Sequence, residues 1–309
     1  MSANAAGRDA NHRGVALAYW ALAAALALGS AATAAEIRLA DDSGRSVTLK
    51  QPAQRIISLA PHMTELLFAA GAGALVVGAV EYSDFPAAAQ RIPRVGDSAQ
   101  LDLERIVALK PDLIVVWQKG NAQRQLDKLL RLGIPVFYNA SNRLSDIARA
   151  VEQLGRLAGT EEVALPTART FAAREAELRR RYAGRSLVTV FFQIWDKPLM
   201  TVNDDHLISD VIRLCGGQNM FAELKPLTPV VSTEAVLAAD PESIGGVTAE
   251  AGQAGNLDMW KKWPRVRAVA RGSLFVIPAE LITRNTPRIL DGALQVCENL
   301  EKARLTRPK

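Results

Sequence analysis

Histidine is nearly missing from this sequence. Only three occur in 309 residues, and the first lies in the N-terminal stretch described below. The remaining two, His62 and His206, are too few for a three-histidine zinc site or a histidine-rich zinc receptor. A G-x-S-x-G nucleophile motif is also missing. A secreted hydrolase with Ser58, His62 and Asp84 as its triad is the one enzymatic alternative that remains.

Clusters of like charge are missing as well. The formal net charge is +5, but no block of five like charges occurs. Aromatic residues are not interleaved with basic clusters, as they are in modules that bind nucleic acid. The sequence therefore predicts no nucleic-acid partner, and its basic balance is only a weak indication of an acidic partner.

The longest apolar run is short for a membrane span. Residues 15–29 (VALAYWALAAALALG) form a run of 15 residues, whereas a spanning helix needs about 20. Arg8 and Arg13 precede this run, and Ala32-Thr33-Ala34 follows it with the A-x-A pattern of a cleavage site. These features predict a signal peptide over residues 1–35 and export of the mature chain. An uncleaved anchor is the alternative.

Cysteine is scarce, with only Cys215 and Cys297 present. In an exported protein, a single pair predicts one disulfide. It would close a loop of about 80 residues and contribute ~4 kcal/mol in the chain-entropy model. Two free buried thiols are the alternative.

Short apolar strands alternate with helices in two separate stretches, after a strand and turn over residues 36–54. The first stretch has predicted strands at 56–59, 75–80, 113–117 and 135–138 and helices at 64–70, 103–109, 121–132 and 145–158. The second has strands at 187–193, 243–247 and 273–277 and helices at 206–215, 232–239, 259–269 and 287–304. Such alternation predicts an α/β fold with parallel sheets. No internal repeat is visible.

A long helix is predicted between the two stretches, from Thr160 as N-cap to Tyr182. Pro166 predicts a kink or a late start, because it cannot donate a backbone hydrogen bond. One helical face carries Leu165, Ala168, Phe171, Leu178 and Tyr182. We therefore expect an N-terminal lobe over residues 36–159, a connecting helix over 160–183 and a C-terminal lobe over 184–309. Both lobes should be Rossmann-like, with the ligand cleft between them.

Ligands of open α/β sheets bind beyond the carboxyl ends of the strands. Aromatic and polar side chains gather there: His62, Tyr82, Trp117, Trp195, Glu280 and Arg284. Aromatic rings offer large rigid apolar faces, and those of tyrosine and tryptophan also carry a polar group. The cleft is therefore expected to hold a large, flat and partly polar molecule.

The stretches SLAPHMTELLFAAGAG, VEYSDFP, LDLERIVALKPDLIVVW, DHLISDVIRLCGGQNMF and TRNTPRIL resemble the periplasmic vitamin B12-binding proteins of corrinoid ABC importers. The resemblance covers roughly residues 55–300. The wider family includes haem and siderophore receptors with the same helix-linked lobes.

The resemblance implies a role for several residues. Tyr82 and Trp117 would contact the corrinoid, and Glu280 and Arg284 would lie near it. One surface glutamate in each lobe, Glu104 and Glu234, would dock onto arginines of the membrane permease. The two cysteines match the disulfide pair of the family. No catalytic residue, resident cofactor or metal is implied, since cobalamin is the transported ligand.

The sequence also departs from that pattern. Ser98 and Thr228 lie near positions where two further cleft tryptophans would be expected, and Trp195 is a candidate to compensate from a neighbouring position. His62 has no counterpart in the best-known member. A haem or iron-siderophore receptor is therefore the alternative, with His62 or Tyr82 as the axial ligand of haem iron.

Purely structural roles are open for the same and neighbouring residues. His62 could cap the helix that follows it, and Glu65 could favour the positive end of that helix. Arg284 could simply pair with Glu280. Trp260 and Trp263 are expected to pack on the surface of the second lobe.

Overall fold

The computed structural model describes residues 36–97, 99–118, 123–248 and 257–308. The predicted signal peptide and Ser98 lie outside these ranges. All elements below belong to one compact unit, Ile37–Lys309. Within the described ranges, no helix combines the length and apolarity needed to cross a membrane.

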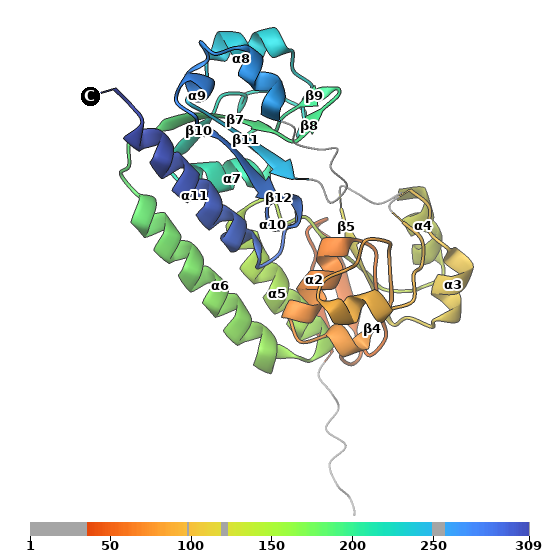
Figure 1. Cartoon of the computed structure of the whole chain (residues 1–309). Helices are drawn as coiled ribbons and strands as arrows, with labels where there is room; N and C mark the ends of the chain where they lie inside the picture. The colour runs from red at the N-terminus through yellow and green to blue at the C-terminus, as the bar shows by residue number, and fades with distance from the viewer. Residues whose placement is uncertain (1–35, 98, 119–122, 249–256, 309) are drawn as a thin grey trace, which may run out of the picture. The chain divides into compact units, whose positions relative to one another are not determined.

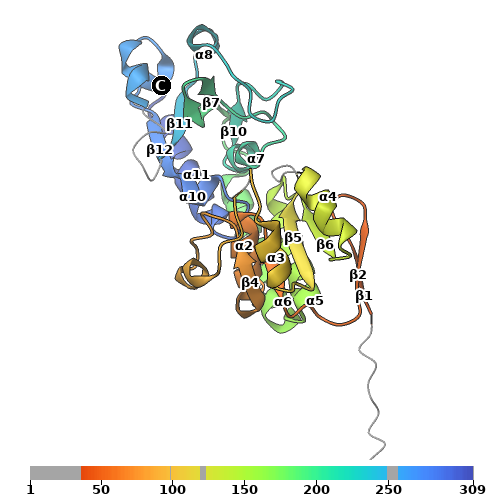
Figure 2. The same ribbon diagram turned by 90° about the vertical axis from the view of Figure 1, so that its right-hand side faces the viewer.

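The N-terminal lobe is built on a parallel sheet. Its strands lie in the order β4 (Val76–Ala79), β3 (Ile56–Ser58), β5 (Leu113–Trp117) and β6 (Val136–Asn139). The 3-10 helix η1 (Gly73–Leu75) leads into β4, and η2 (Ala87–Arg91) follows it. The predicted opening strand and turn form the antiparallel hairpin β1 (Ile37–Ala40) and β2 (Ser46–Leu49). The hairpin lies beside β6 (Figure 2), where Asp42 accepts the backbone N–H of Ala140.

Helices cover both faces of this sheet, as the continuous apolar sequence of β5 predicts. Leu113 and Val115 of β5 pack in the same cluster as residues of α2 (Pro61–Ala69) and α5 (Leu144–Ala158). Ile114 and Val116 pack in a second cluster, with residues of α3 (Leu103–Ala108) and α4 (Gln123–Arg131). The α/β prediction is therefore confirmed, although α2 begins three residues earlier than predicted.

The C-terminal lobe repeats this plan. Its parallel strands lie in the order β10 (Gly217–Asn219), β7 (Val188–Gln193), β11 (Ser243–Thr248) and β12 (Leu274–Pro278). Both four-stranded sheets place the second of their strands in chain order at one edge, followed by the first, third and fourth. The two lobes therefore share a topology that no sequence repeat reveals.

Helices of this lobe largely follow the prediction. They are α7 (Leu207–Leu214), α8 (Thr233–Ala239), η3 (Leu257–Lys262), α9 (Arg267–Ala270) and α11 (Ile289–Leu305). Strand β10, helix α10 (Ala279–Ile282) and the hairpin β8 (Trp195–Asp196) and β9 (Leu199–Met200) were not predicted. Elements of two to four residues are too short to show a period in the sequence.

The long helix α6 (Glu161–Tyr182) joins the lobes and packs against α5, α7 and α11 (Figure 1). The late start predicted from Pro166 is wrong, because the helix begins at Glu161. Thr160 is the N-cap residue, but its hydroxyl donates to Ala70 O (2.6 Å) instead of capping the helix. Leu165 was assigned to the buried face and is 39% exposed. Its neighbour Ala164 is buried instead.

Close packing of α5 against α6 depends on one glycine. A Cβ atom added to Gly155 would lie 2.2 Å from the Cβ of Ala164. Any larger side chain would push the helices apart. The glycine at position 155 therefore allows α5 and α6 to pack this closely.

A disulfide joins Cys215, at the C-terminal end of α7, to Cys297 in α11. The predicted bridge is confirmed, and the alternative of two free thiols is wrong. Trp260 corrects another prediction, because it is fully buried and not on the surface. Its ring packs against Phe191, and its indole N–H donates to Gln193 Oε1 (2.8 Å). The half-buried Trp263 lies against it.

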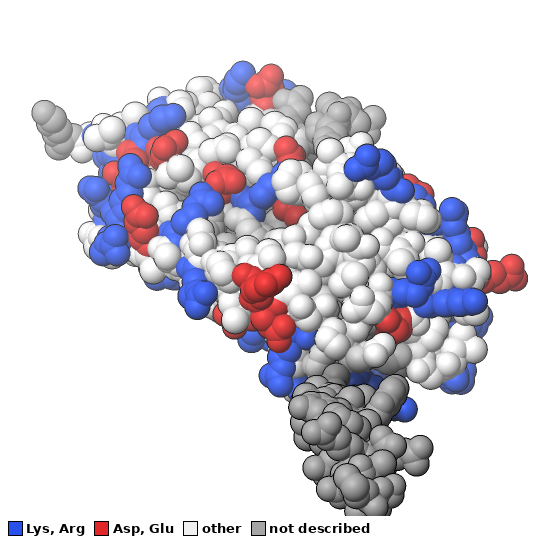
Figure 3. Space-filling model, turned by 90° about the horizontal axis from the view of Figure 1, so that it is seen from below, with Lys and Arg blue, Asp and Glu red and all other residues white. Residues whose placement is uncertain are grey.

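The sequence predicts that charges of both signs are interspersed on the surface. On the face seen in Figure 3, Lys and Arg side chains are interspersed with Asp and Glu, and a broad uncharged area lies between them. This face therefore presents no large field of a single sign.

Candidate ligand-binding site

A pocket of about 290 Å³ lies between the two lobes. The N-terminal lobe contributes Trp117, at the end of β5, and Ser141 and Asn142, which follow β6. The C-terminal lobe contributes Asp205, His206, Leu207, Leu227, Thr228, Thr283 and Asn285. The pocket is at the small end of the usual range for ligand sites. It combines one large aromatic face with amide and hydroxyl groups.

The lobes touch each other next to this pocket. The amide of Asn285 donates to Ser141 O, and both residues line the pocket. The backbone N–H of Leu144, at the start of α5, donates to the carboxylate of Asp210 in α7 (2.9 Å). These contacts fix the separation of the lobes at one end of the site.

His62 lies in the first turn of α2 and is only 8% exposed. Its ring meets that of Trp117 edge-on, with 5.4 Å between centroids. Among the described residues, Nε2 has no hydrogen-bond partner. Burial, and then the nearby charge of Arg284, lower the pKa of His62 to about 4. The imidazole is therefore neutral at pH 7. It is not a helix cap, because Ala60 is the N-cap residue of α2 and no side chain caps it.

The loop that follows β4 presents Tyr82 to solvent. This side chain is 76% exposed, and its backbone φ of 63° lies in the left-handed region. The next residue is anchored: the buried hydroxyl of Ser83 is hydrogen-bonded to that of Thr64 (3.0 Å), which in turn donates to Ser58 (2.8 Å). The exposed Tyr82 is thus followed directly by a residue that buried hydrogen bonds hold in place.

Two arginines from the C-terminal lobe reach this loop. Arg284 donates to the carboxylate of Asp84 (2.5 Å) and to Tyr82 O (3.4 Å). Burial acts to raise the pKa of Asp84, but the hydrogen bond from Arg284 and its charge outweigh this and lower the pKa. Among the described contacts, Arg284 therefore pairs with Asp84 and not with Glu280, contrary to one prediction.

Arg288 forms the second connection. It donates to both carboxylate oxygens of Glu65 (2.7 and 2.8 Å), and its guanidinium lies 3.7 Å from the centre of the Phe85 ring. Glu65 was predicted to interact with the positive end of its helix. It is the fifth residue of α2 and lies too far along the helix for that role, so it forms a buried ion pair with the other lobe instead.

Trp117 is the one predicted site residue among the described residues that line the pocket; His62, Tyr82, Trp195, Glu280 and Arg284 do not line it. Trp195 is 44% exposed on β8, and its indole N–H donates to Lys197 O (3.0 Å). Glu280 is half-buried in α10. The hydrogen bond that Arg288 donates to Glu65 is the main reason that the pKa of Arg288 is raised, and the charge of Glu280 adds to it. Neither Trp195 nor Glu280 is among the described residues that line the pocket.

The structure does not assemble the imagined triad. Ser58 donates to Ala60 O, and Asp84 is engaged by Arg284. Across the described parts of the chain, no group of three His, Cys, Asp or Glu residues could hold a metal ion.

Several pocket residues were missed in the sequence. Ser141 and Asn142 follow a correctly predicted strand, so the strand-end rule could have identified them. Asn285 follows the unpredicted α10 and lies in the TRNTPRIL stretch, but nothing in that stretch distinguished it as a pocket residue. Thr228, noted only where a tryptophan was expected, lines the pocket together with Trp117.

Glu104 and Glu234 occupy equivalent places in the two lobes. Each is the second residue of a short helix, α3 or α8, and each is exposed. The N-cap side chains, Asp102 and Ser232, accept the N–H of the third helical residue (2.9 and 3.1 Å). The pKa of Glu234 is lowered by its own backbone N–H and by Ser232. Each lobe thus presents one exposed carboxylate from the same structural position.

Comparisons with known proteins agree with this architecture. Residues 56–281 match the sequence model of the periplasmic binding protein family. A vitamin B12-binding protein of Vibrio cholerae is 40% identical over 253 residues, which cover 82% of this chain and 91% of the relative. That of Yersinia pestis is 37% identical over 251 residues, covering 81% of this chain and 87% of the relative.

Solved structures give the same picture. The crystal structure of the periplasmic vitamin B12-binding protein of Vibrio cholerae superimposes with a TM-score of 0.76 at 38% identity, covering 82% of this chain and 98% of that one. A periplasmic haem-binding protein in complex with two haems has a TM-score of 0.72 at 18% identity, covering 81% and 98%. The second similarity supports a common fold only.

Proposed function

Since this chain belongs to the periplasmic binding protein family, we propose that it is a periplasmic receptor that captures cobalamin or a related corrinoid and delivers it to an ABC importer. The observation that carries this proposal is the 40% identity, over 82% of the chain, to a protein named for binding vitamin B12. Residues 1–35 then act as the signal peptide, and the protein binds its ligand without changing it.

In this proposal the two lobes and the connecting helix have different roles. Residues 36–159 and 184–309 form the two ligand-binding lobes, and residues 160–183 connect them. A single stiff helix limits how far the lobes can separate, which suits a bulky ligand held in a preformed cleft. The permease and its ATPase are the partners, and Glu104 and Glu234 form the docking contacts.

Individual residues have distinct roles at the ligand. The ring of Trp117, in the pocket, and that of Tyr82, exposed on its loop, pack against the corrin. Trp195 extends the apolar surface beyond the pocket. Arg284 and Glu280 provide polar partners for the amide groups around the macrocycle. His62 supports Trp117 from behind with a neutral imidazole.

Haem or an iron siderophore is the second candidate ligand. The phenol of Tyr82 is exposed, and His62 keeps an unpartnered, neutral Nε2 within the described region. Both groups are able to ligate iron. A haem complex would show a Soret band that shifts in Tyr82→Ala or His62→Ala.

Titration of the purified mature protein with cyanocobalamin tests the first candidate. Quenching of tryptophan fluorescence should give a Kd between about 1 nM and 1 μM, roughly −12 to −8 kcal/mol. Tyr82→Ala should weaken binding, whereas Arg174→Met, which breaks an exposed ion pair between α6 and α11, should not. If cyanocobalamin causes neither fluorescence quenching nor a heat of binding in calorimetry, the corrinoid proposal is refuted. Hydrolysis of a panel of esters that is lost in His62→Ala would favour the alternative of a secreted hydrolase.

A further inference from the structure

Arg288 precedes α11 in the C-terminal lobe, but its side chain contacts residues of the N-terminal lobe. Its guanidinium is fixed in two directions. The edge meets both oxygens of Glu65, and the flat face covers the ring of Phe85. A planar fork of donors with an exposed face is what distinguishes arginine from lysine. The geometry therefore uses the whole guanidinium and not only its charge.

The partner of Arg288 makes this contact hard to break. Glu65 is 3% exposed, and the side chain of Arg288 is 21% exposed. Removing one member of a buried ion pair leaves the other charge desolvated and uncompensated. Arg288 is therefore held in one orientation, and the Phe85 ring beneath it is held as well.

Phe85 is the last residue of the loop that presents Tyr82. The other end of this loop is held by Arg284, through Tyr82 O and the carboxylate of Asp84. Tyr82 itself has a left-handed backbone, which non-glycine residues adopt only where their surroundings impose it. Contacts from the opposite lobe therefore contribute to the conformation in which the tyrosine is exposed.

We propose that Arg288 is a positioning residue of the ligand site: it holds Phe85, and through it the Tyr82–Phe85 loop, in the conformation that presents Tyr82 to the ligand. Its contribution to affinity rests on the proposed function, since it acts through a tyrosine that contacts the ligand. Its hold on the loop does not depend on which ligand is bound.

Hydrogen exchange in the unliganded mature protein tests the hold on the loop. Amides of residues 81–85 should exchange several-fold faster in Arg288→Lys and Arg288→Met, because both lose the bidentate contact and the stacked face. Lysine keeps a positive charge opposite Glu65, so this variant serves if the methionine variant does not fold. The matched control is Arg174→Met, which breaks an exposed arginine–carboxylate pair with Asp291 of α11. Unchanged exchange of the loop in a folded Arg288 variant would overturn the inference.

A double-mutant cycle with Tyr82→Ala tests the link to binding. Arg288→Lys should weaken cobalamin binding about tenfold when Tyr82 is present, and much less in the Tyr82→Ala background. An equal loss in both backgrounds would mean that Arg288 does not act through Tyr82. If the wild-type protein does not bind cobalamin, the proposed function fails, whereas the exchange experiment still decides whether Arg288 holds the loop.

Discussion

At the residue scale, His62 connects the site to the stability of the protein. Its buried imidazole has a pKa of about 4 in the folded state, compared with 6.5 ordinarily. Between these two values the unfolded chain binds a proton that the folded protein does not. The contribution of His62 to the free energy of unfolding is therefore fully present above about pH 6.5, where the imidazole is neutral in both states. It is lost as the pH falls towards 4.

His62→Gln should make the free energy of unfolding less sensitive to acid. Glutamine is neutral at every pH, so the difference between wild type and variant should change by roughly 3 kcal/mol between pH 7 and pH 4. Urea unfolding of both proteins at pH 7, 5.5 and 4 measures this. All other titratable groups are common to both proteins and cancel in the comparison. If the free energies of unfolding of the two proteins changed equally with pH, His62 would be protonated in the folded protein as readily as in the unfolded chain.

Single residues also show where sequence reasoning reaches its limit. His62, Tyr82 and Trp117 were proposed as site residues because they follow apolar strands, and strand ends meet at one edge of a sheet. The ion pair between Glu65 and Arg288 joins positions 223 residues apart. Nothing local distinguishes either of them from an ordinary surface charge, so the sequence alone could not predict their pairing.

At the element scale, long periodic segments were predicted well. Strand β5 was placed at its observed bounds, and α5 ends at Ala158, followed by Gly159 as C-cap residue with the left-handed φ of 69° expected of a C-terminal glycine. The hairpin β8–β9 was missed because two-residue strands carry no period. Of the two outcomes expected from Pro166, the late start was wrong, because α6 begins at Glu161.

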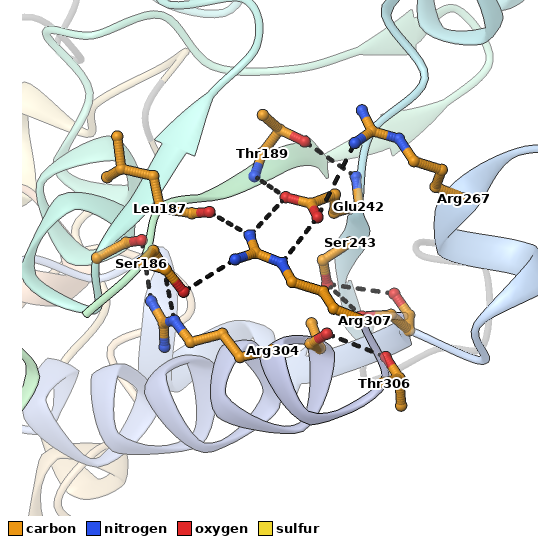
Figure 4. Close-up of polar contacts among 12 residues, drawn as sticks. Ser186, Leu187, Thr189, Glu242, Ser243, Arg267, Arg304, Thr306 and Arg307 are labelled. Atoms are coloured by element: carbon orange, nitrogen blue, oxygen red, sulfur yellow. Dashed lines mark hydrogen bonds and ion pairs between the residues drawn. The ribbon is translucent and has the colours of Figure 1, made fainter. Parts of the chain in front are cut away.

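The C-terminal end of α11 is held by a buried carboxylate, which gives a prediction at this scale. Arg307 donates to both oxygens of Glu242 (3.0 and 2.8 Å), and the backbone N–H of Thr189 donates to the same carboxylate (Figure 4). Arg271 adds a further contact. Burial acts to raise the pKa of Glu242, but the hydrogen bond from Arg307 is the chief of several contacts that lower it overall. The ionised carboxylate thus joins the end of α11 to β7 and β11.

Glu242→Gln should destabilise the protein by about 1–3 kcal/mol at pH 7, because it weakens several charge-assisted hydrogen bonds at a buried site. The stabilising contribution of the ionised form is present above pH 4.5 and is lost as the pH falls through the lower folded pKa. The difference in the free energy of unfolding between wild type and variant should therefore become smaller at acidic pH. Urea unfolding measures it, with Asp291→Asn as the exposed control, for which less than about 1 kcal/mol is expected. Equal losses of unfolding free energy in Glu242→Gln and Asp291→Asn would contradict the conclusion that the buried carboxylate stabilises the end of α11.

At the scale of the whole molecule, the two lobes repeat one plan. The helix before the third strand of each sheet, α3 or α8, begins with a capping side chain and carries an exposed glutamate as its second residue. Each of these helices is followed by a residue with positive φ, Lys110 or Asp240, and then by a proline. A partner with two similar subunits could therefore be recognised through the same contact twice, once in each lobe.

Glu104→Ala and Glu234→Ala should each weaken docking to the importer roughly five- to tenfold and leave cobalamin affinity unchanged, since exposed charges at an interface rim mainly steer and orient association. The double variant should lose both contacts, and raising the salt concentration should affect the wild type more than the double variant. Receptor-stimulated ATP hydrolysis by the reconstituted importer, measured against receptor concentration, separates docking from ligand capture. Glu177→Ala, on the exposed face of α6, is the matched control. If only one of the two glutamates matters, docking does not use the lobes as equivalents, and if neither does, the importer binds another face of the receptor.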